Sequence, residues 1–443
     1  MQNTKFSKIG YILSMAGSAI GLGTAWKFPT MVGQNGGFAF ILLFVILSFI
    51  VGATAFLAEA VLGKLGKTDA KAALMELAPT HKKFWSLGGF SCFTGLLVIS
   101  FYLVIVGWLC YYALCAFFGY ADDEIEAKML FEYLLNEDWQ GQGVSFLIVF
   151  YFAFWVIFKG IKNGIERLNV FLLPALFVLL LAMLVYCAFF GNFSAALSFI
   201  FTPDFSKIFD ADLILNALGL AVWSCSLGLC VVYTYANNTS ENTNIFSSIF
   251  YIILLNLAVG VLMGLVVFSF VPISNATQGA GLIFISLASL FGSLGLVGQI
   301  LGFVFFVALI FAGITSAVSM IEPNVVFLEN NLKISRQKAI TFIAIFVFLL
   351  GTACMLSHYD EYEAYLKFGG KSLFKLIDLG TANILMPLTA LFFSIFIGWV
   401  TPKQKVFSVF ENFVPRKIIL VWYFLLRFIV PVAIISVGVY NFI

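Results

Sequence analysis

Residues 10–30 read GYILSMAGSAIGLGTAWKFPT, an apolar segment that is long enough to cross a membrane. Gly17, Gly21 and Gly23 stand at its middle, where each glycine costs about 1 kcal/mol of helix stability relative to alanine. Broken backbone at membrane depth is tolerated only where it is buried in protein or lines a cavity. The stretch therefore indicates a broken transmembrane helix, with close helix packing through small residues as the alternative.

A second stretch, NALGLAVWSCSLGLCVVYTY at residues 216–235, is interrupted in the same way by Ser224, Ser226 and Gly228. Two interrupted spans at corresponding positions of two halves point to a transporter site at the interface of inverted repeats. The positions correspond here, because the first stretch opens one set of five spans and the second opens another.

The composition excludes most other classes of protein. The 443 residues are 62% hydrophobic and only 10% charged, whereas about a quarter of a soluble domain is charged. The sequence has no basic run longer than a pair such as Lys82-Lys83, so it gives no indication of nucleic-acid binding. No acid–base or nucleophile constellation faces a common cavity, so an enzyme is not expected. A polytopic membrane protein remains.

Apolar runs between charged connectors predict eleven spans. The segment 277–293 is apolar but short and rich in glycine, so we expect a re-entrant or surface helix there, with a twelfth span as the alternative. The spans are expected near residues 10–32, 38–62, 87–118, 143–159, 164–190, 211–236, 245–271, 299–328, 338–356, 372–398 and 417–442.

Positive charge in the connectors predicts the orientation, because cytoplasmic loops carry an excess of Lys and Arg. With the N-terminus inside, only five of the 24 Lys and Arg residues fall outside, namely Lys128, Lys207, Lys367, Lys371 and Lys375. An odd number of spans then places the C-terminus outside. We expect a multi-pass protein of the plasma (inner) membrane.

An ordered series of motifs resembles the neurotransmitter:sodium symporter family, in its bacterial amino-acid transporter branch with eleven spans. The series opens with SMAGSAIGLGTAWKFPTMVGQNGGFAF at residues 14–40 and covers nearly the whole chain. Further matches are Glu59 with Gly63, Tyr102, Trp108, KGIKNGIERLNVFLLPALF (159–177), SCSLGLCVVYTY (224–235), Asn256, FAGITSAVSMIEP (311–323) and DLGTANILMPL (378–388).

The resemblance implies an all-α polytopic fold built as a five-plus-five inverted repeat, with broken first and sixth helices and one additional helix. Residues 1–443 would form one transporter domain, with repeats at 10–190 and 211–398 and the additional span at 417–442. It further implies sodium-coupled symport of an amino acid into the cell by alternating access. A non-transporting amino-acid sensor or a channel-like protein on the same scaffold is the alternative. The oligomeric state is not indicated.

The resemblance also implies a substrate site. The substrate carboxylate would lie against Gly21 and Gly23 near the Tyr102 hydroxyl, where half-helix N-termini favour negative charge. Gly21 occupies the position of an aspartate in monoamine carriers, so the substrate should bring its own carboxylate. Because the lining is mainly apolar, a hydrophobic or aromatic amino acid is expected. The full set is Ala19, Gly21, Gly23, Val98, Tyr102, Trp223, Ser226, Leu229, Ser316 and Met320.

Trp223 stands where the family usually has a phenylalanine lid, and an ordinary packing aromatic is the alternative. Two ionisable residues, Lys27 and Asp378, match an outer gate pair in which the family usually has arginine. Lysine offers a point charge rather than a bidentate fork, so the closed gate should be weaker or water-bridged. Snorkelling of Lys27 to the headgroups is the alternative.

Sodium needs several oxygen ligands, which broken helices provide as free carbonyls and hydroxyls. The resemblance implies one intact sodium site between spans 1 and 8, and simple back-bonding by its two hydroxyls is the alternative. In this site the backbone carbonyls of Gly17, Ile20 and Ala312 and the side-chain hydroxyls of Thr315 and Ser316 would bind the ion. A second site is doubtful, because Thr24 replaces the usual asparagine; its members are Ala19, Thr24, Ser224 and Asn256.

The positions that would hold chloride, or a carboxylate in its place, read Phe44, Leu220 and Gly260, and only Ser224 of that set survives. A second buried cation would lack its compensating anion, which is costly. We therefore expect transport to be independent of chloride, with one sodium ion per cycle as the alternative to two.

On the inner side, the expected Arg/Asp gate pair reads Gln2 and Asn330, with Lys5 and Glu329 as candidate substitutes. At the start of span 5, Gly164 and Pro174 resemble an arrangement that lets this helix unwind and admit water to the sodium ion. A proline that merely kinks the helix is the alternative.

Overall fold

The computed structural model describes residues 5–271 and 279–440, and these residues are almost entirely helical. Nine of their helices are long and apolar enough to cross a membrane, and a tenth crossing is a pair of helices bent by 53°. The described strands are only β1 (Lys367–Phe368) and β2 (Lys371–Ser372), which pair antiparallel. The predicted all-α polytopic fold is therefore confirmed.

The first half of the chain contains the first five predicted spans and their connectors. Its elements are α1 (Lys8–Ala19), η1 (Gly23–Lys27), α2 (Phe28–Gln34), α3 (Phe38–Leu47), η2 (Ser48–Gly52), α4 (Ala53–Leu65), α5 (Ala70–Leu77), α6 (Lys82–Ser86), η3 (Leu87–Ser91), α7 (Cys92–Cys115), α8 (Glu124–Asn136), α9 (Trp139–Phe158), η4 (Ile161–Glu166), α10 (Arg167–Phe190) and α11 (Phe193–Phe201).

The second half contains the remaining spans. Its elements are α12 (Ala211–Trp223), α13 (Val231–Asn237), α14 (Ile245–Phe270), η6 (Leu282–Leu287), α15 (Ala288–Ser293), α16 (Gly295–Leu332), α17 (Arg336–Leu356), η7 (Asp360–Tyr362), α18 (Glu363–Leu366), α19 (Leu373–Gly380), η8 (Thr381–Leu385), α20 (Met386–Ile395), η9 (Phe396–Val400), α21 (Lys403–Ser408), α22 (Arg416–Phe424), η10 (Leu425–Ile429) and α23 (Val430–Tyr440).

Both predicted interruptions are present. α1 ends at Ala19, Ile20 leaves helical geometry, and the chain restarts at Gly23 after a 53° bend. The sixth span consists of two short helices, α12 and α13, joined by residues 224–230. Helical structure is lost where the glycines and serines gather, as their low helix propensity predicts.

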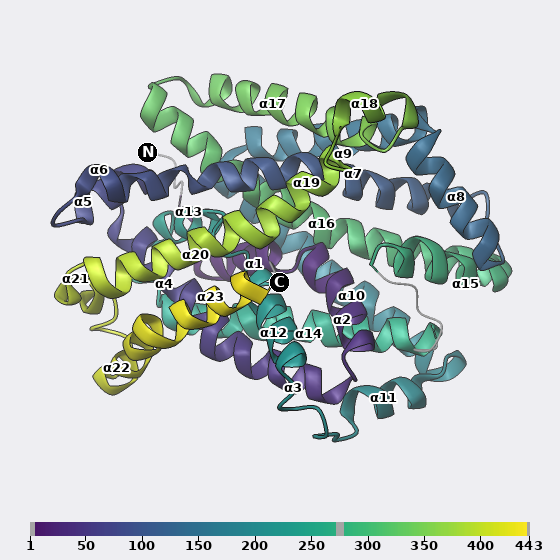
Figure 1. Cartoon of the computed structure of the whole chain (residues 1–443), viewed down its shortest axis with the longest axis horizontal. Helices are drawn as coiled ribbons and strands as arrows, with labels where there is room; N and C mark the ends of the chain where they lie inside the picture. Colours follow the sequence, from purple (N-terminus) through teal and green to yellow (C-terminus); the bar gives the residue numbers. More distant parts are fainter. Residues whose placement is uncertain (1–4, 272–278, 441–443) are drawn as a thin grey trace.

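The broken first span lies inside the bundle, where α1 packs against α10, α14 and α16. The third span, Lys82–Cys115, is the most enclosed of the long helices, with 89% of its apolar window buried. In Figure 1, α5, α6 and α21 gather toward the left, whereas α8, α11 and α15 gather toward the right. The connectors predicted to be cytoplasmic thus lie at one end of the bundle and those predicted to be outer at the other.

Some predicted boundaries were wrong. The eighth span, predicted at residues 299–328, is the 38-residue helix α16, and the third span begins at Lys82 rather than at residue 87. From residue 279 onward, the segment predicted as a surface or re-entrant helix forms η6 and α15, which pack on α8 and α16. Residues 277 and 278 lie outside the described part of the chain.

Candidate functional site

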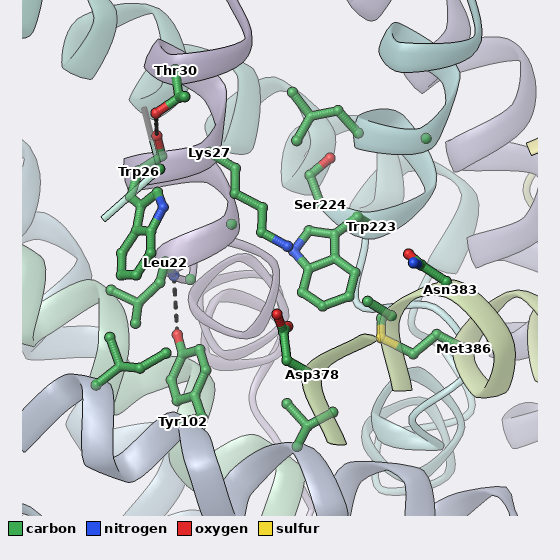
Figure 2. Close-up of a pocket in the computed structure, with 18 of the residues that line it drawn as sticks. Leu22, Trp26, Lys27, Thr30, Tyr102, Trp223, Ser224, Asp378, Asn383 and Met386 are labelled. Carbon is green, nitrogen blue, oxygen red and sulfur yellow. Dashed lines mark hydrogen bonds between the residues drawn. The ribbon is translucent and has the colours of Figure 1, made fainter. Parts of the chain in front are cut away.

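A cavity of about 770 Å³ lies between the two broken spans. It reaches the exposed residues Gln34 and Lys375, so it opens at the end predicted to be outer. Figure 2 shows Leu22, Trp26 and Lys27 from the first span facing Trp223 and Asp378 across this space. Every predicted substrate residue lines it together with both gate residues, namely Ala19, Gly21, Gly23, Lys27, Val98, Tyr102, Trp223, Ser226, Leu229, Ser316, Met320 and Asp378.

The glycines of the first break bring backbone and side chains unusually close. A Cβ on Gly21 would lie 2.9 Å from both Ser316 Oγ and Tyr102 Oη, and a Cβ on Gly23 would lie 2.6 Å from Trp223 Nε1. Neither position has room for a side chain. An aspartate at position 21 is therefore incompatible with this packing, and Asp378 is the one acid among the described residues that line the cavity.

Tyr102 on α7 is held by the broken backbone. Its hydroxyl oxygen accepts a hydrogen bond from the Leu22 amide at 3.0 Å, so its own proton can still be donated to another acceptor. Figure 2 shows this bond at the base of the cavity. The carbonyl of Ser18 accepts from the hydroxyls of Ser226 at 2.9 Å and Ser316 at 3.1 Å. These hydrogen bonds thus link span 1 to spans 3, 6 and 8 around its break.

The sixth break is held in a strained conformation by a buried acid. Ser226 and Cys230 have φ values of 51° and 58°, which non-glycine residues seldom adopt. The Glu59 carboxylate on α4 is 1% exposed, and it accepts from the amides of Gly228 at 3.3 Å and Tyr233 at 3.4 Å. Glu59 therefore satisfies backbone donors that the interrupted helix leaves free.

The residues predicted for the first sodium site lie at the contact of α1 with α16. A Cβ on Gly17 would lie 3.2 Å from Thr315 Cβ. Gly21 donates its amide proton to Ala19 O at 3.0 Å, so helical bonding to the Gly17 carbonyl has ended. Ile20 and Ala312 are fully buried. Thr315 Oγ1 donates to the carbonyls of Phe311 at 2.9 Å and Ala312 at 3.0 Å, so its hydroxyl is back-bonded in this structure.

The residues predicted for the second sodium site also come together, but they bond to one another. Thr24 Oγ1 donates to Asn256 Oδ1 at 2.6 Å and approaches Ala19 O at 3.4 Å. Asn256 Nδ2 in turn donates to the Ser224 carbonyl at 3.2 Å. The two side-chain oxygens that would hold a cation are thus joined by a short neutral hydrogen bond.

The neighbouring region, where an anion would sit, is filled with aromatic rings. Phe28 and Phe44 are each 1% exposed, with ring centroids 5.2 Å apart. A Cβ on Gly260 would meet the Phe28 ring at 3.3 Å and Thr24 Cγ2 at 3.4 Å. Phe28, Phe44 and Gly260 offer an anion no side-chain donor, whereas the Ser224 hydroxyl donates to Ala221 O at 3.4 Å. Burial of an unpaired charge is costly.

Lys27 lies over the lid aromatic, because its Nζ is 3.7 Å from the Trp223 ring centroid. Figure 2 shows the lysine side chain crossing the cavity toward the indole, with Asp378 near the same ring. The Asp378 carboxylate is 3.8 Å from Lys375 Nζ. Lys27 therefore points into the cavity rather than snorkelling outward, and the two gate residues are not in direct contact.

At the end predicted to be inner, the ion pairs differ from those expected. Arg336 at the start of α17 makes a bidentate contact with buried Glu322, at 2.7 and 2.9 Å, and lies 3.5 Å from Glu329. Glu329 thus pairs with Arg336, whereas Lys5 is exposed, so the candidate substitution by Lys5 and Glu329 is not realised in this structure. Gln2 lies outside the described residues.

The first residues of α1 are tied to span 5. Ser7 caps α1, donates its hydroxyl proton to Glu166 at 2.6 Å and its amide to the same carboxylate at 3.2 Å. Lys162 completes the cluster at 2.7 Å from Glu166. A serine at the start of an apolar run is a helix-capping signal in the sequence. Its contact with Glu166, 159 residues away, has no such signal.

His358 was missed as a cavity residue because it stands in a connector of the sequence. It lines the cavity, with its ring centroid 6.0 Å from Trp108 and 5.0 Å from Phe374. Burial lowers the pKa of His358. No local signal indicated this position, because the aromatic partners come from spans 3 and 10.

Two interrupted helices around a cavity inside a membrane bundle define a secondary transporter, in which substrate binds near unwound backbone. The comparisons with known proteins agree. The sequence profile of the sodium:neurotransmitter symporter family matches residues 3–121 and 137–443. The chain belongs to this family and is a sodium-dependent, multi-pass membrane transporter, so the predicted family is confirmed.

Relatives are similar over nearly their whole lengths. An uncharacterized sodium-dependent transporter of Bacillus subtilis, YhdH, is 33% identical over 97% of this chain and 96% of its own. A similar transporter of Haemophilus influenzae is 28% identical, over 99% and 98% of the two chains. The crystal structure of MhsT in complex with L-phenylalanine superposes with a TM-score of 0.87 at 29% identity and covers 99% of each chain. Family and neighbours are transporters rather than enzymes.

Proposed function

We propose that this transporter couples sodium to the uptake of a hydrophobic or aromatic amino acid by alternating access. The observation that carries the proposal is the chemistry of the cavity. Asp378 is the sole acid among the described residues that line it, whereas Lys27 and Lys375 provide positive charge. The packed glycine floor excludes an aspartate that would bind an amine. A substrate with its own carboxylate fits this arrangement.

The carboxylate would approach Gly21 and Gly23 and accept the free proton of Tyr102. The side chain would extend toward Val98, Leu229 and Met320, which are apolar and line the same cavity. Bound L-phenylalanine in MhsT, a structural neighbour of similar sequence, supports this class of substrate. Sodium would bind between α1 and α16, through Gly17, Ile20, Ala312, Thr315 and Ser316.

We further propose that transport uses one sodium ion and needs no chloride. The Thr24–Asn256 hydrogen bond takes the place of a second cation, and the Phe28 and Phe44 rings occupy the anion region. The charge distribution supports a cytoplasmic N-terminus and an outer C-terminus in the plasma (inner) membrane. The alternating-access cycle would open the cavity at each end in turn.

Thermal unfolding of the purified protein, with each of the twenty amino acids and with sodium or choline, tests the substrate class. We expect stabilisation by a few hydrophobic or aromatic amino acids, and only in sodium. Stabilisation by charged or amine ligands instead would contradict the proposal. Counterflow of the labelled ligand in proteoliposomes then distinguishes transport from binding alone.

A further inference from the structure

Asn169 on α10 has a buried amide oxygen for which the fold offers no partner. The residue is 0% exposed, and among the described residues its Oδ1 receives no hydrogen bond. Its Nδ2 donates to Ile165 O, one turn earlier, at 2.8 Å. This bond fixes the orientation of the amide, because a flipped group would place an oxygen against that carbonyl. The unpartnered atom is therefore an oxygen.

This oxygen lies against Gly17, one of the residues of the sodium site predicted between α1 and α16. A Cβ on Gly17 would lie 2.0 Å from Asn169 Oδ1 and 3.2 Å from Thr315 Cβ, so the three residues surround one small volume. Gly17 is a proposed carbonyl ligand and Thr315 a proposed hydroxyl ligand. A buried, unsatisfied oxygen in a native fold needs an explanation, and an ion is one of the few available.

Asn169 is one of two residues of span 5 that pack against glycines of α1. Glu166, one turn earlier, holds Ser7 at the beginning of α1, and a Cβ on Gly10 would lie 2.2 Å from the Glu166 carboxyl carbon. The helices α1 and α10 thus meet through two glycines, Gly10 and Gly17, with Glu166 and Asn169 opposite them.

We propose that Asn169 Oδ1 is a further ligand of the sodium ion between α1 and α16, provided by span 5. Sodium is a hard cation that takes several neutral oxygens, and an amide oxygen is among its suitable ligands. The ion then joins three helices, α1, α10 and α16, rather than two. Departure of sodium removes this link through Asn169, which follows the π-helical start of span 5 at Ile161–Glu166.

This inference rests on the proposed sodium site, and the test separates the two. Sodium binding to the full-length purified protein is measured with radioactive sodium in the Asn169→Ala, Asn169→Asp and Asn324→Ala variants and in the double variant Thr315→Val/Ser316→Ala. Asn324 is the matched control, because it is also 0% exposed, has an unpartnered Oδ1 among the described residues and donates one turn back to Met320 O at 3.1 Å.

We expect Asn169→Ala to weaken sodium binding about tenfold, the effect of losing one polar contact to a charge, and Asn324→Ala to change it by less than about twofold. Asn169→Asp retains the oxygen, so it should restore binding relative to alanine and make it weaken on acidification, because protons then compete with sodium. A purely structural amide would not produce this pH dependence.

The outcomes are distinguishable. Unchanged sodium affinity in a folded Asn169→Ala protein, with binding lost in the double variant, would overturn the role of Asn169 and leave the proposed site standing. Unchanged affinity in both would overturn the site itself. An equal loss in Asn169→Ala and Asn324→Ala, without rescue by aspartate, would also overturn the inference, because it would reflect general destabilisation.

Discussion

At the scale of single residues, Trp223 and Lys27 shape the cavity between the two broken spans. The lysine ammonium lies over the indole at 3.7 Å, and the indole nitrogen fills the space where a Cβ on Gly23 would be. A cation over an aromatic face contributes about 0.5–2 kcal/mol. The contact therefore holds the Lys27 ammonium beside the indole of Trp223.

Replacing the lid should change which side chains fit. Trp223→Phe removes ring volume beside Gly23, so we expect binding of the largest aromatic amino acid to improve relative to leucine. Competition binding at saturating sodium measures the ratio. Trp155→Phe is the matched control, because Lys159 Nζ lies 3.3 Å from the Trp155 centroid on an exposed part of α9. An unchanged ratio in the Trp223 variant would remove Trp223 from the pocket.

Thr315 and Ser316 test the sodium site directly. Their double substitution to valine and alanine should abolish stabilisation by sodium while the protein stays folded, since two oxygen ligands are lost. Thr341→Val is the control, because Thr341 makes the same kind of back-bond, to Gln337 O at 2.9 Å, on exposed α17. If sodium affinity survives in the double variant, these hydroxyls are only back-bonding groups.

At the scale of elements, the broken sixth span depends on one backbone position. Gly228 has a φ of 79°, and a Cβ there would lie 2.5 Å from Met386 O on span 10. Both the left-handed conformation and the close approach exclude a side chain. The break is thus held between Glu59 on one side and α20 on the other.

Gly228→Ala should therefore destabilise the protein by roughly 2 kcal/mol or more, the usual cost of a strained backbone position. The same substitution at Gly219, in the regular helix α12 of the same span, meets only Val437 Cγ1 at 3.6 Å and should not destabilise. Thermal unfolding in detergent compares the two. Equal melting temperatures for both variants would contradict the strained-break account.

The sequence predicted the existence of these elements better than their extent. Glycine and serine clusters identified both breaks, because local propensity decides where a helix ends. The length of α16 was underestimated, since Gly295–Gly298 and Glu329–Leu332 look like connector residues, yet the helix continues through both segments although only Gly298 among them is buried. Contacts between distant segments, such as Ser7 with Glu166 or Arg336 with Glu322, have no local signal.

At the scale of the whole molecule, the transport cycle should not respond to chloride. The aromatic rings of Phe28 and Phe44 occupy the region where an anion would compensate a second cation. Uptake in proteoliposomes should stay unchanged when gluconate replaces chloride at constant sodium. A large drop in uptake would show that an anion site lies elsewhere in the bundle.

The candidate site as a whole could be predicted because residues from four spans match motifs of the family, and the structure brings them around one cavity. The motifs could not predict which hydrogen bonds and packing contacts each side chain makes. The bond between Thr24 and Asn256, the filling of the anion region and the free oxygen of Asn169 all depend on how side chains from different spans meet. The replacement of the usual asparagine by Thr24 predicted a weakened second sodium site, but not the hydrogen bond that Thr24 makes.

Coupling of substrate to sodium is measured by the reversal potential of substrate flux in proteoliposomes with a known sodium gradient. A potential that balances the sodium and substrate gradients reports how many sodium ions move with each neutral amino acid. The account predicts one sodium ion per substrate. A value of two would show that Ala19, Thr24, Ser224 and Asn256 hold a second ion, and flux independent of the sodium gradient would contradict the coupling itself.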